Sequence, residues 1–154
     1  MEPDFKHLIG LGVLILVVIV RQWYVRRKVN RMNAAFGEAM EALKRGDWAV
    51  VRKNMEACIA DYPHASGARR LLARALAGQG DLTRAEEELK LAVAFEPREA
   101  QHLAELALFQ IRYTEEANGL KLLEEAFQLN PALRDDLRQN ASLSPEVRAK
   151  IFGA

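Results

Sequence analysis

The stretch LLARALAGQGDLTRAEEELKLAVAFEP, residues 71–97, decides the fold. Apolar and alanine side chains recur in it at intervals of three and four, which is the spacing of amphipathic helices. Gly80-Asp81 supplies a helix stop followed by a turn. Pro97 cannot continue the second helix inside its hydrogen-bond ladder, so that helix ends before it. The stretch therefore predicts two helices joined by a tight turn.

This helical hairpin is one copy of a repeated unit. Pro63, Pro97 and Pro131 lie 34 residues apart, and Gly46-Asp47 precedes Gly80-Asp81 by the same interval. A fixed period of this length is typical of a short supersecondary unit that has been copied and stacked. The period therefore predicts a solenoid in which each unit packs against its neighbours.

Aligning the copies on their prolines places small residues where paired helices must approach closely, with bulky apolar residues beside them. The small residues are Ala73, Ala85, Ala92, Ala107, Gly119 and Ala126, and the bulky ones are Met55, Leu89 and Leu123. The pattern resembles the tetratricopeptide repeat (TPR) over about residues 32–131, in copies at 32–63, 66–97 and 100–131. The first copy has Glu38 where the family prefers leucine, and the third has Thr114-Glu115-Glu116 in place of the Gly-Asp turn.

The spacing predicts helices at 5–45, 48–61, 65–78, 82–95, 98–113 and 116–129. No glycine or proline lies between Val13 and Phe36, so the first helix is expected to run straight into the first repeat. Residues 132–154 are expected to form a cap, whose last helix is opened by Ser144-Pro145-Glu146. Four apolar residues of the cap would cover the open end of the third repeat: Leu133, Leu137, Val147 and Ile151.

An unbroken apolar run, Leu8–Val20, precedes the repeats. As a helix, residues 5–25 span about 31 Å, which matches the roughly 30 Å hydrocarbon core of a bilayer. Phe5 at one end, with Trp23 and Tyr24 at the other, are aromatic residues of the kind expected at the two interfaces. A cleaved signal peptide is rejected, because the start MEPDF lacks a positive region and no small-residue cleavage site follows the run.

Five cations follow the apolar run, and those at 26–31 form a basic juxtamembrane collar. Because cations favour the cytoplasmic side, residues 5–25 are predicted to cross the inner membrane once, with the carboxyl side in the cytoplasm. Lys6 and Arg21 are expected to extend toward the headgroups, although Arg21 could instead pair with an acidic group of a membrane partner. The predicted membrane-interface residues are Lys6, Arg21, Trp23, Tyr24, Arg26, Arg27 and Lys28.

The charge pattern and the scattered reactive residues exclude several classes of function. From residue 32 onward, acidic side chains outnumber basic ones by 19 to 16, so nucleic acid is not a predicted partner. His102 and Glu105 lie three residues apart and are interpreted as a solvated pair. Cys58 occupies a small packing position, where an inert buried thiol is expected. We predict no catalytic residue, no metal, no cofactor and no enzymatic activity.

The TPR resemblance implies a superhelix whose concave face, lined by the first helix of each repeat, binds a peptide or a helix. The residues that would line this groove are Phe36, Met40, Lys44, Arg70, Arg74, Leu108 and Arg112. Apolar residues beside cations suit a protein segment with acidic and apolar side chains. Arg70 and Arg74 are also open to interpretation as two solvated like charges. The asparagines of the family's two-carboxylate clamp are absent, which argues against a receptor for chaperone tails.

The predicted fold class is all-α: an N-terminal transmembrane helix, a three-repeat TPR α-solenoid and a C-terminal capping helix. The predicted function is a membrane-anchored scaffold or adaptor that binds a protein partner at the cytoplasmic face of the membrane. Two alternatives share this architecture. One is an accessory structural subunit of an integral membrane complex, in which the span contacts other subunits, and the other is a regulator of envelope assembly.

Overall fold

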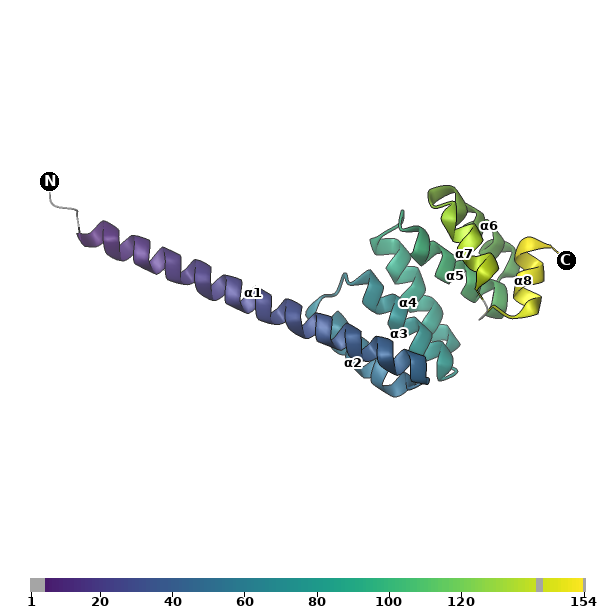
Figure 1. The fold of residues 1–154 in the computed structure, drawn as a ribbon, viewed down its shortest axis with the longest axis horizontal. Helices are drawn as coiled ribbons and strands as arrows, with labels where there is room; N and C mark the ends of the chain where they lie inside the picture. The colour runs from purple at the N-terminus through teal and green to yellow at the C-terminus, as the bar shows by residue number, and fades with distance from the viewer. Residues whose placement is uncertain (1–4, 141–142, 154) are drawn as a thin grey trace.

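The computed structural model describes residues 5–140 and 143–153, with side chains from Ile9 onward, and these residues form helices joined by short turns (Figure 1). The all-α fold predicted from the sequence is confirmed. The helix bounds agree with the predicted ones, except that α3 and α5 begin one and two residues later. The helices are α1 (Phe5–Arg45), α2 (Trp48–Asp61), α3 (Ser66–Gly78), α4 (Leu82–Phe95), α5 (Ala100–Tyr113), α6 (Glu116–Leu129), α7 (Ala132–Gln139) and α8 (Pro145–Phe152).

Glycine and aspartate shape the first two hairpin turns. Gly46 and Gly80 have φ angles of 71° and 86°, a region that glycine enters at no steric cost. The carboxylates of Asp47 and Asp81 each accept a hydrogen bond of 3.3 Å from the backbone N–H three residues later, and so cap α2 and α4. The α5–α6 turn has neither a glycine with positive φ nor a capping carboxylate, since Glu115 precedes α6 without a side-chain hydrogen bond. The third hairpin therefore depends more heavily on packing.

Paired helices approach most closely at the small residues. Ala92, Ala107 and Ala126 are completely buried. Gly119 marks the tightest contact between α5 and α6: a Cβ atom there would lie 2.7 Å from the carbonyl oxygen of Ala107 and 2.9 Å from the backbone nitrogen of Ile111. The backbones of the two helices thus leave no room for a methyl group at this point.

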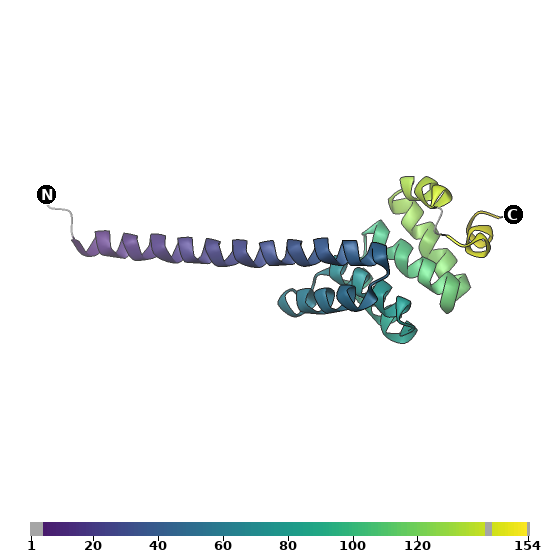
Figure 2. The ribbon, with the colours of Figure 1, turned by 60° about the horizontal axis from the view of Figure 1, so that its bottom comes forward.

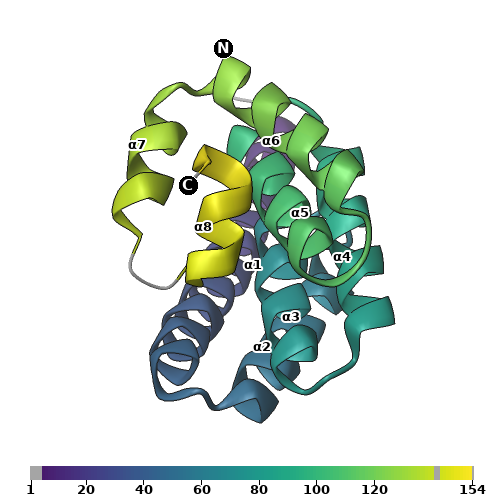
Figure 3. The same ribbon diagram turned by 90° about the vertical axis from the view of Figure 1, so that its right-hand side faces the viewer.

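The core consists of two clusters. The first is built from α1 to α4 with two residues of α5, and Val51, Met55 and Leu76 are among its fully buried side chains. The second joins α5 and α6 to the cap around Leu123. All four cap residues expected to cover the third repeat are buried or partly buried in this second cluster: Leu133, Leu137, Val147 and Ile151. Figure 3 shows α8 beside α5, and the two helices are in contact.

Hydrogen bonds cross the junction between the second and third repeats. Gln110 of α5, which is 3% exposed, donates to Glu86 of α4 at 3.0 Å and accepts from Asn118 of α6 at 2.7 Å. The bond from Gln110 holds the pKa of Glu86 below its ordinary value, against the opposing effect of burial. The buried amide is therefore paired on both sides, and it links three helices.

Helix α1 has two different environments (Figures 1 and 2). Its C-terminal part packs into the first repeat, where Ala39 and Ala42 are fully buried. Its N-terminal part projects away from the solenoid, and the large apolar side chains from Ile9 to Val20 are 47–60% exposed. Among the described residues, α1 is the one helix with the length and apolarity of a membrane span, as judged by a mean hydropathy of 1.7. A signal sequence meets the same criterion.

Candidate functional site

The first helices of the three repeats, α1, α3 and α5, are neighbours in space, since α3 contacts both of the others. The predicted groove residues occupy matching positions on them. Met40, Arg74 and Leu108 are separated by the 34-residue period, and Phe36 precedes Arg70 by the same interval. The repeat therefore sets these positions in register on adjacent helices, where they carry apolar or cationic side chains of different exposure.

Arg70 and Arg74 of α3 share the carboxylate of Glu105 on α5. Arg70 Nη1 donates to Glu105 Oε1 at 2.9 Å, Arg74 Nε donates to Oε2 at 2.9 Å, and Arg74 Nη2 also donates to Oε1. The side chains of Arg70 and Glu105 are 19% and 13% exposed, whereas that of Arg74 is 44% exposed. The interpretation of the arginines as solvated like charges is therefore wrong, because one carboxylate bridges them and leaves one net positive charge.

The three apolar groove residues are not equally available. Phe36 is half-buried and packs against the first core cluster. Leu108 is half-buried against the second cluster, which includes residues of the cap. Met40 on α1 is exposed at 43%. Of the three, Met40 therefore offers the largest share of open apolar surface.

The two remaining groove residues are exposed cations. Lys44 Nζ donates to Glu41 Oε1 at 2.7 Å, and this hydrogen bond, aided by the charge of Lys44, lowers the pKa of Glu41. Arg112 lies near the end of α5, with its guanidinium 5.6 Å from the centroid of the Tyr113 ring. Pairs on an open surface contribute little to stability, so both cations remain available to a binding partner.

The histidine and the cysteine singled out in the sequence, His102 and Cys58, are both buried. His102 is 5% exposed, and its Nε2 lies 3.1 Å from a carboxylate oxygen of Glu96, so the interpretation of His102 and Glu105 as a solvated pair is wrong. Cys58 is 5% exposed, and burial raises the pKa of its thiol. Within the described part of the chain, no group of three or more His, Cys, Asp and Glu is arranged to hold a metal ion.

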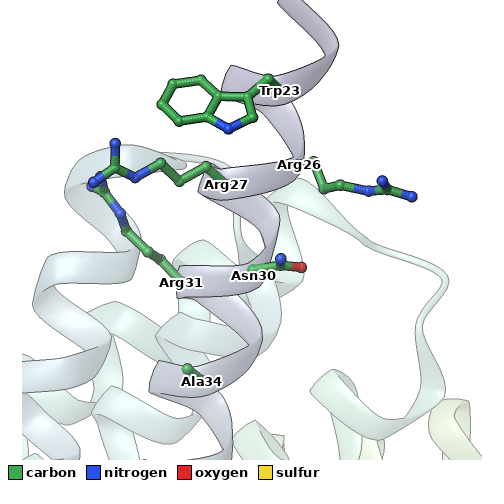
Figure 4. A pocket seen from close by; sticks show the side chains of 6 residues that line it. All are labelled: Trp23, Arg26, Arg27, Asn30, Arg31 and Ala34. Carbon is green, nitrogen blue, oxygen red and sulfur yellow. The ribbon is translucent and has the colours of Figure 1, made fainter.

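The residues predicted at the membrane interface lie on α1 and are exposed, except for Lys28, which is half-buried, and Lys6, whose side chain falls outside the described ones. Figure 4 shows Arg27 extending under the Trp23 ring, with its Cζ atom 5.3 Å from the ring centroid. Arg31 directs its guanidinium to the same side, whereas Arg26 points away (Figure 4). Over residues 9–140 and 143–153, none of the cations at 21, 26, 27 and 31 has an acidic partner.

Lys28 differs from the other collar cations because it turns toward the repeats. Its Nζ atom donates to the carbonyl oxygen of Asp61 at 2.9 Å and lies 3.8 Å from Asp61 Oδ1. The ammonium group also lies 4.4 Å from the centroid of the Tyr62 ring. The sequence assigned Lys28 to the membrane interface, whereas in the structure its ammonium group contacts residues at the C-terminal end of α2.

Residues 42–107 match the family model described as tetratricopeptide repeat, and a search of curated proteins finds no match. Among solved structures, a mutant of the Thermobaculum terrenum O-GlcNAc transferase is 24% identical, with a TM-score of 0.65, and the match covers 81% of this chain and 25% of that one. The TPR2B domain of yeast Sti1 in its pHsp70 complex is 20% identical, with a TM-score of 0.64 over 80% and 94% of the two chains. MamA of Desulfovibrio magneticus RS-1, from residue 41 to the end, is 22% identical, with a TM-score of 0.60 over 81% and 71%.

The fold is that of a TPR solenoid. The matched region, residues 42–107, contains α2 to α4 with parts of α1 and α5. The structural likenesses extend the agreement to about four fifths of the chain, and at these identities they establish the fold alone. The present chain spans only a quarter of the transferase that it resembles.

Proposed function

We propose that the chain is a single-pass membrane adaptor whose TPR solenoid binds a protein partner at the cytoplasmic face of the inner membrane. The observation that carries the proposal is the continuity of α1, which joins an uncovered apolar half to the first repeat without a break. Apolar surface left in water costs about 25 cal/mol per Å², so this half favours a bilayer. Arginines that have no acidic partner among the described side chains follow directly after it, which supports a cytoplasmic carboxyl side.

The partner is proposed to bind across α1, α3 and α5, where Met40, Lys44, Arg74 and Arg112 are exposed. The net positive charge left by the shared carboxylate adds to the charge of Arg112 and to that of Lys44, whose pair with Glu41 lies on the open surface, so a segment with acidic side chains is favoured. Met40 offers an adaptable apolar contact. The TPR2B domain of Sti1 was solved in a pHsp70 complex, which supports a protein as the partner of a similar fold.

Site-specific photo-crosslinking in native membranes tests this surface. A crosslinking amino acid at Met40 should capture a discrete partner, whereas the same group at Ala57, an exposed residue of α2, should not. The double variant Lys44→Glu with Arg112→Glu should weaken capture at Met40, because it reverses the charge of the surface. Exposed charges change stability by no more than about 0.5 kcal/mol, so the thermal unfolding should stay nearly unchanged. Equal capture at both positions, or capture insensitive to the charge reversal, would reject this surface.

An accessory subunit of a membrane complex is the second candidate, and Arg21 favours it. This residue follows the apolar run directly, is exposed, and has no acidic partner among the described residues. A cation at this depth is stabilised either by reaching the headgroups or by an acid of another subunit. Arg21→Leu should abolish a larger assembly on a native gel if a subunit supplies that acid. An unchanged assembly, with partner capture at Met40 retained, would favour the adaptor.

A further inference from the structure

The repeat domain begins at the level of the basic collar, without a linker. Lys28 is the collar residue that ties α1 to the end of α2, through the contacts to Asp61 and Tyr62 given above. It follows Val25, the predicted end of the span, by three residues, which is about 4.5 Å of helix. The C-terminal end of α2 is therefore held close to the level at which α1 leaves the hydrocarbon.

The turn after α2 is joined to the end of α4. The ring of His64 packs edge-on against that of Phe95, with their centroids 4.6 Å apart. Figures 1 and 2 show α2 running back along α1, so this turn lies on the side of the domain from which the apolar half of α1 projects. The surface formed there is named the α2/α4 tip, and it consists of Tyr62, His64, Leu91 and Phe95.

The α2/α4 tip exposes apolar side chains, one of which is held by a neighbouring arginine. Leu91 and Phe95 are 40% and 36% exposed, and they are among the few large apolar residues exposed outside α1. Arg69 packs against Phe95: its guanidinium lies 5.3 Å from the Phe95 ring centroid, pairs with Glu88 at 2.6 Å and donates to the carbonyl oxygen of Pro63 at 2.8 Å. Of the neighbouring carboxylates, that of Glu88 is largely buried against Arg69, whereas those of Asp61, 3.8 Å from Lys28 Nζ, and Glu96, which faces His102, are 53% exposed. The tip is therefore an aromatic and apolar surface with exposed carboxylates beside it.

We propose that the α2/α4 tip is a second membrane contact, which rests in the headgroup layer beside α1. This inference depends on the membrane anchor proposed above. A lipid surface is the occupant that fits, because aromatic side chains favour the interface and the arginines of the collar, which have no acidic partner in the described part of the chain, attract anionic headgroups. Because α1 continues into the solenoid, two membrane contacts, α1 and the α2/α4 tip, would together fix the tilt of the repeat domain. They would also fix the height of the groove above the membrane.

Depth-dependent fluorescence quenching of the full-length protein tests the contact. Single cysteines replace Ala60 or Ala94, exposed residues in the last turns of α2 and α4, in a Cys58→Ala background. Each carries an environment-sensitive fluorophore, and the protein is reconstituted into vesicles of phosphatidylcholine and phosphatidylglycerol. The quencher is a phospholipid with a nitroxide on its headgroup. All four tip side chains remain in place in these variants.

The matched controls are cysteines at Ala49 and Thr83, exposed residues in the first turns of the same two helices. Each lies 11 residues from its test position, which is about 17 Å along the helix. A cysteine at Gln22 on α1 reports on the anchor itself. Circular dichroism before and after labelling confirms that every variant is folded.

Quenching at Ala60→Cys and Ala94→Cys should be several-fold stronger than at the two controls. Adding Leu91→Ser and Phe95→Ser should remove this difference at Ala60→Cys and leave the quenching at Gln22→Cys unchanged. Strong quenching at Gln22→Cys, with test and control positions alike, would overturn the tip contact and leave the anchor standing. An unquenched Gln22→Cys would overturn the anchor and the tip together.

Discussion

Replacing Gly119 by alanine tests the closest packing in the solenoid. The added Cβ would lie 2.7 Å from the carbonyl oxygen of Ala107, 2.8 Å from Ile111 Cγ1 and 2.9 Å from the Ile111 backbone nitrogen. Two of these atoms belong to the backbone of α5, so the clash is relieved only if the two helices separate. Overpacking costs about 1–3 kcal/mol, and the better helix propensity of alanine returns about 1 kcal/mol. Because two of the clashing atoms are backbone, the overpacking cost should lie in the upper part of its range, at about 2–3 kcal/mol, so we expect Gly119→Ala to destabilise the protein by roughly 1–2 kcal/mol net.

Urea unfolding of the full-length protein in mild detergent, followed by circular dichroism, measures this change. Gly37→Ala is the matched control, because it lies inside helix α1 and nothing lies within 4 Å of the position of its Cβ. There the substitution should stabilise the protein by up to about 1 kcal/mol. If Gly119→Ala is as stable as the wild type, or is stabilised like the control, the close approach of α5 and α6 is refuted.

Three further changes probe the packing, the shared carboxylate and the buried thiol. Ala126→Leu should cost about 1–3 kcal/mol, because this position has no exposed surface, and an unchanged melting temperature would count against the packing register. Glu105→Gln should cost about 1–3 kcal/mol in urea unfolding, because Arg70 and Arg74 lose the charge that they share, and an unchanged midpoint would contradict this pairing. Burial raises the pKa of Cys58 above its ordinary value of 9.0, so its contribution to stability is complete below that value and is lost as the pH rises through the folded-state pKa. Alkylation of Cys58 in the folded protein should be much slower than in urea, and equal rates would show that the thiol is not buried.

The repeat period was sufficient to predict the helices and their pairing. Prolines end helices and Gly-Asp pairs form turns through local backbone chemistry, which is independent of the rest of the fold. Burial of small residues follows from the same period, as the completely buried Ala92 and Ala126 show. The cap residues could be predicted for a similar reason, since the third repeat leaves an apolar face that the next segment must cover.

Side-chain contacts between neighbouring repeats could not be predicted from the period. Glu105 lies 35 and 31 residues after Arg70 and Arg74, close to one repeat length, but the superhelical twist decides which side chains meet. Lys28 was assigned to the membrane interface because it lies in a run of cations, and its contact with Asp61 depends on where α2 ends beside α1. The groove is consequently more neutral than the sequence suggested, and one collar cation, Lys28, contacts the end of α2.

The central claim is a TPR solenoid held at the cytoplasmic face by α1, and the topology of the chain tests it most directly. A dual reporter fused to the C-terminus would combine alkaline phosphatase, which is active only outside the cytoplasm, with a fluorescent protein that matures only inside it. The positive collar predicts fluorescence without phosphatase activity, with the fusion in the membrane fraction and resistant to extraction by alkaline carbonate. Phosphatase activity without fluorescence, or a fusion released by carbonate, would contradict the account.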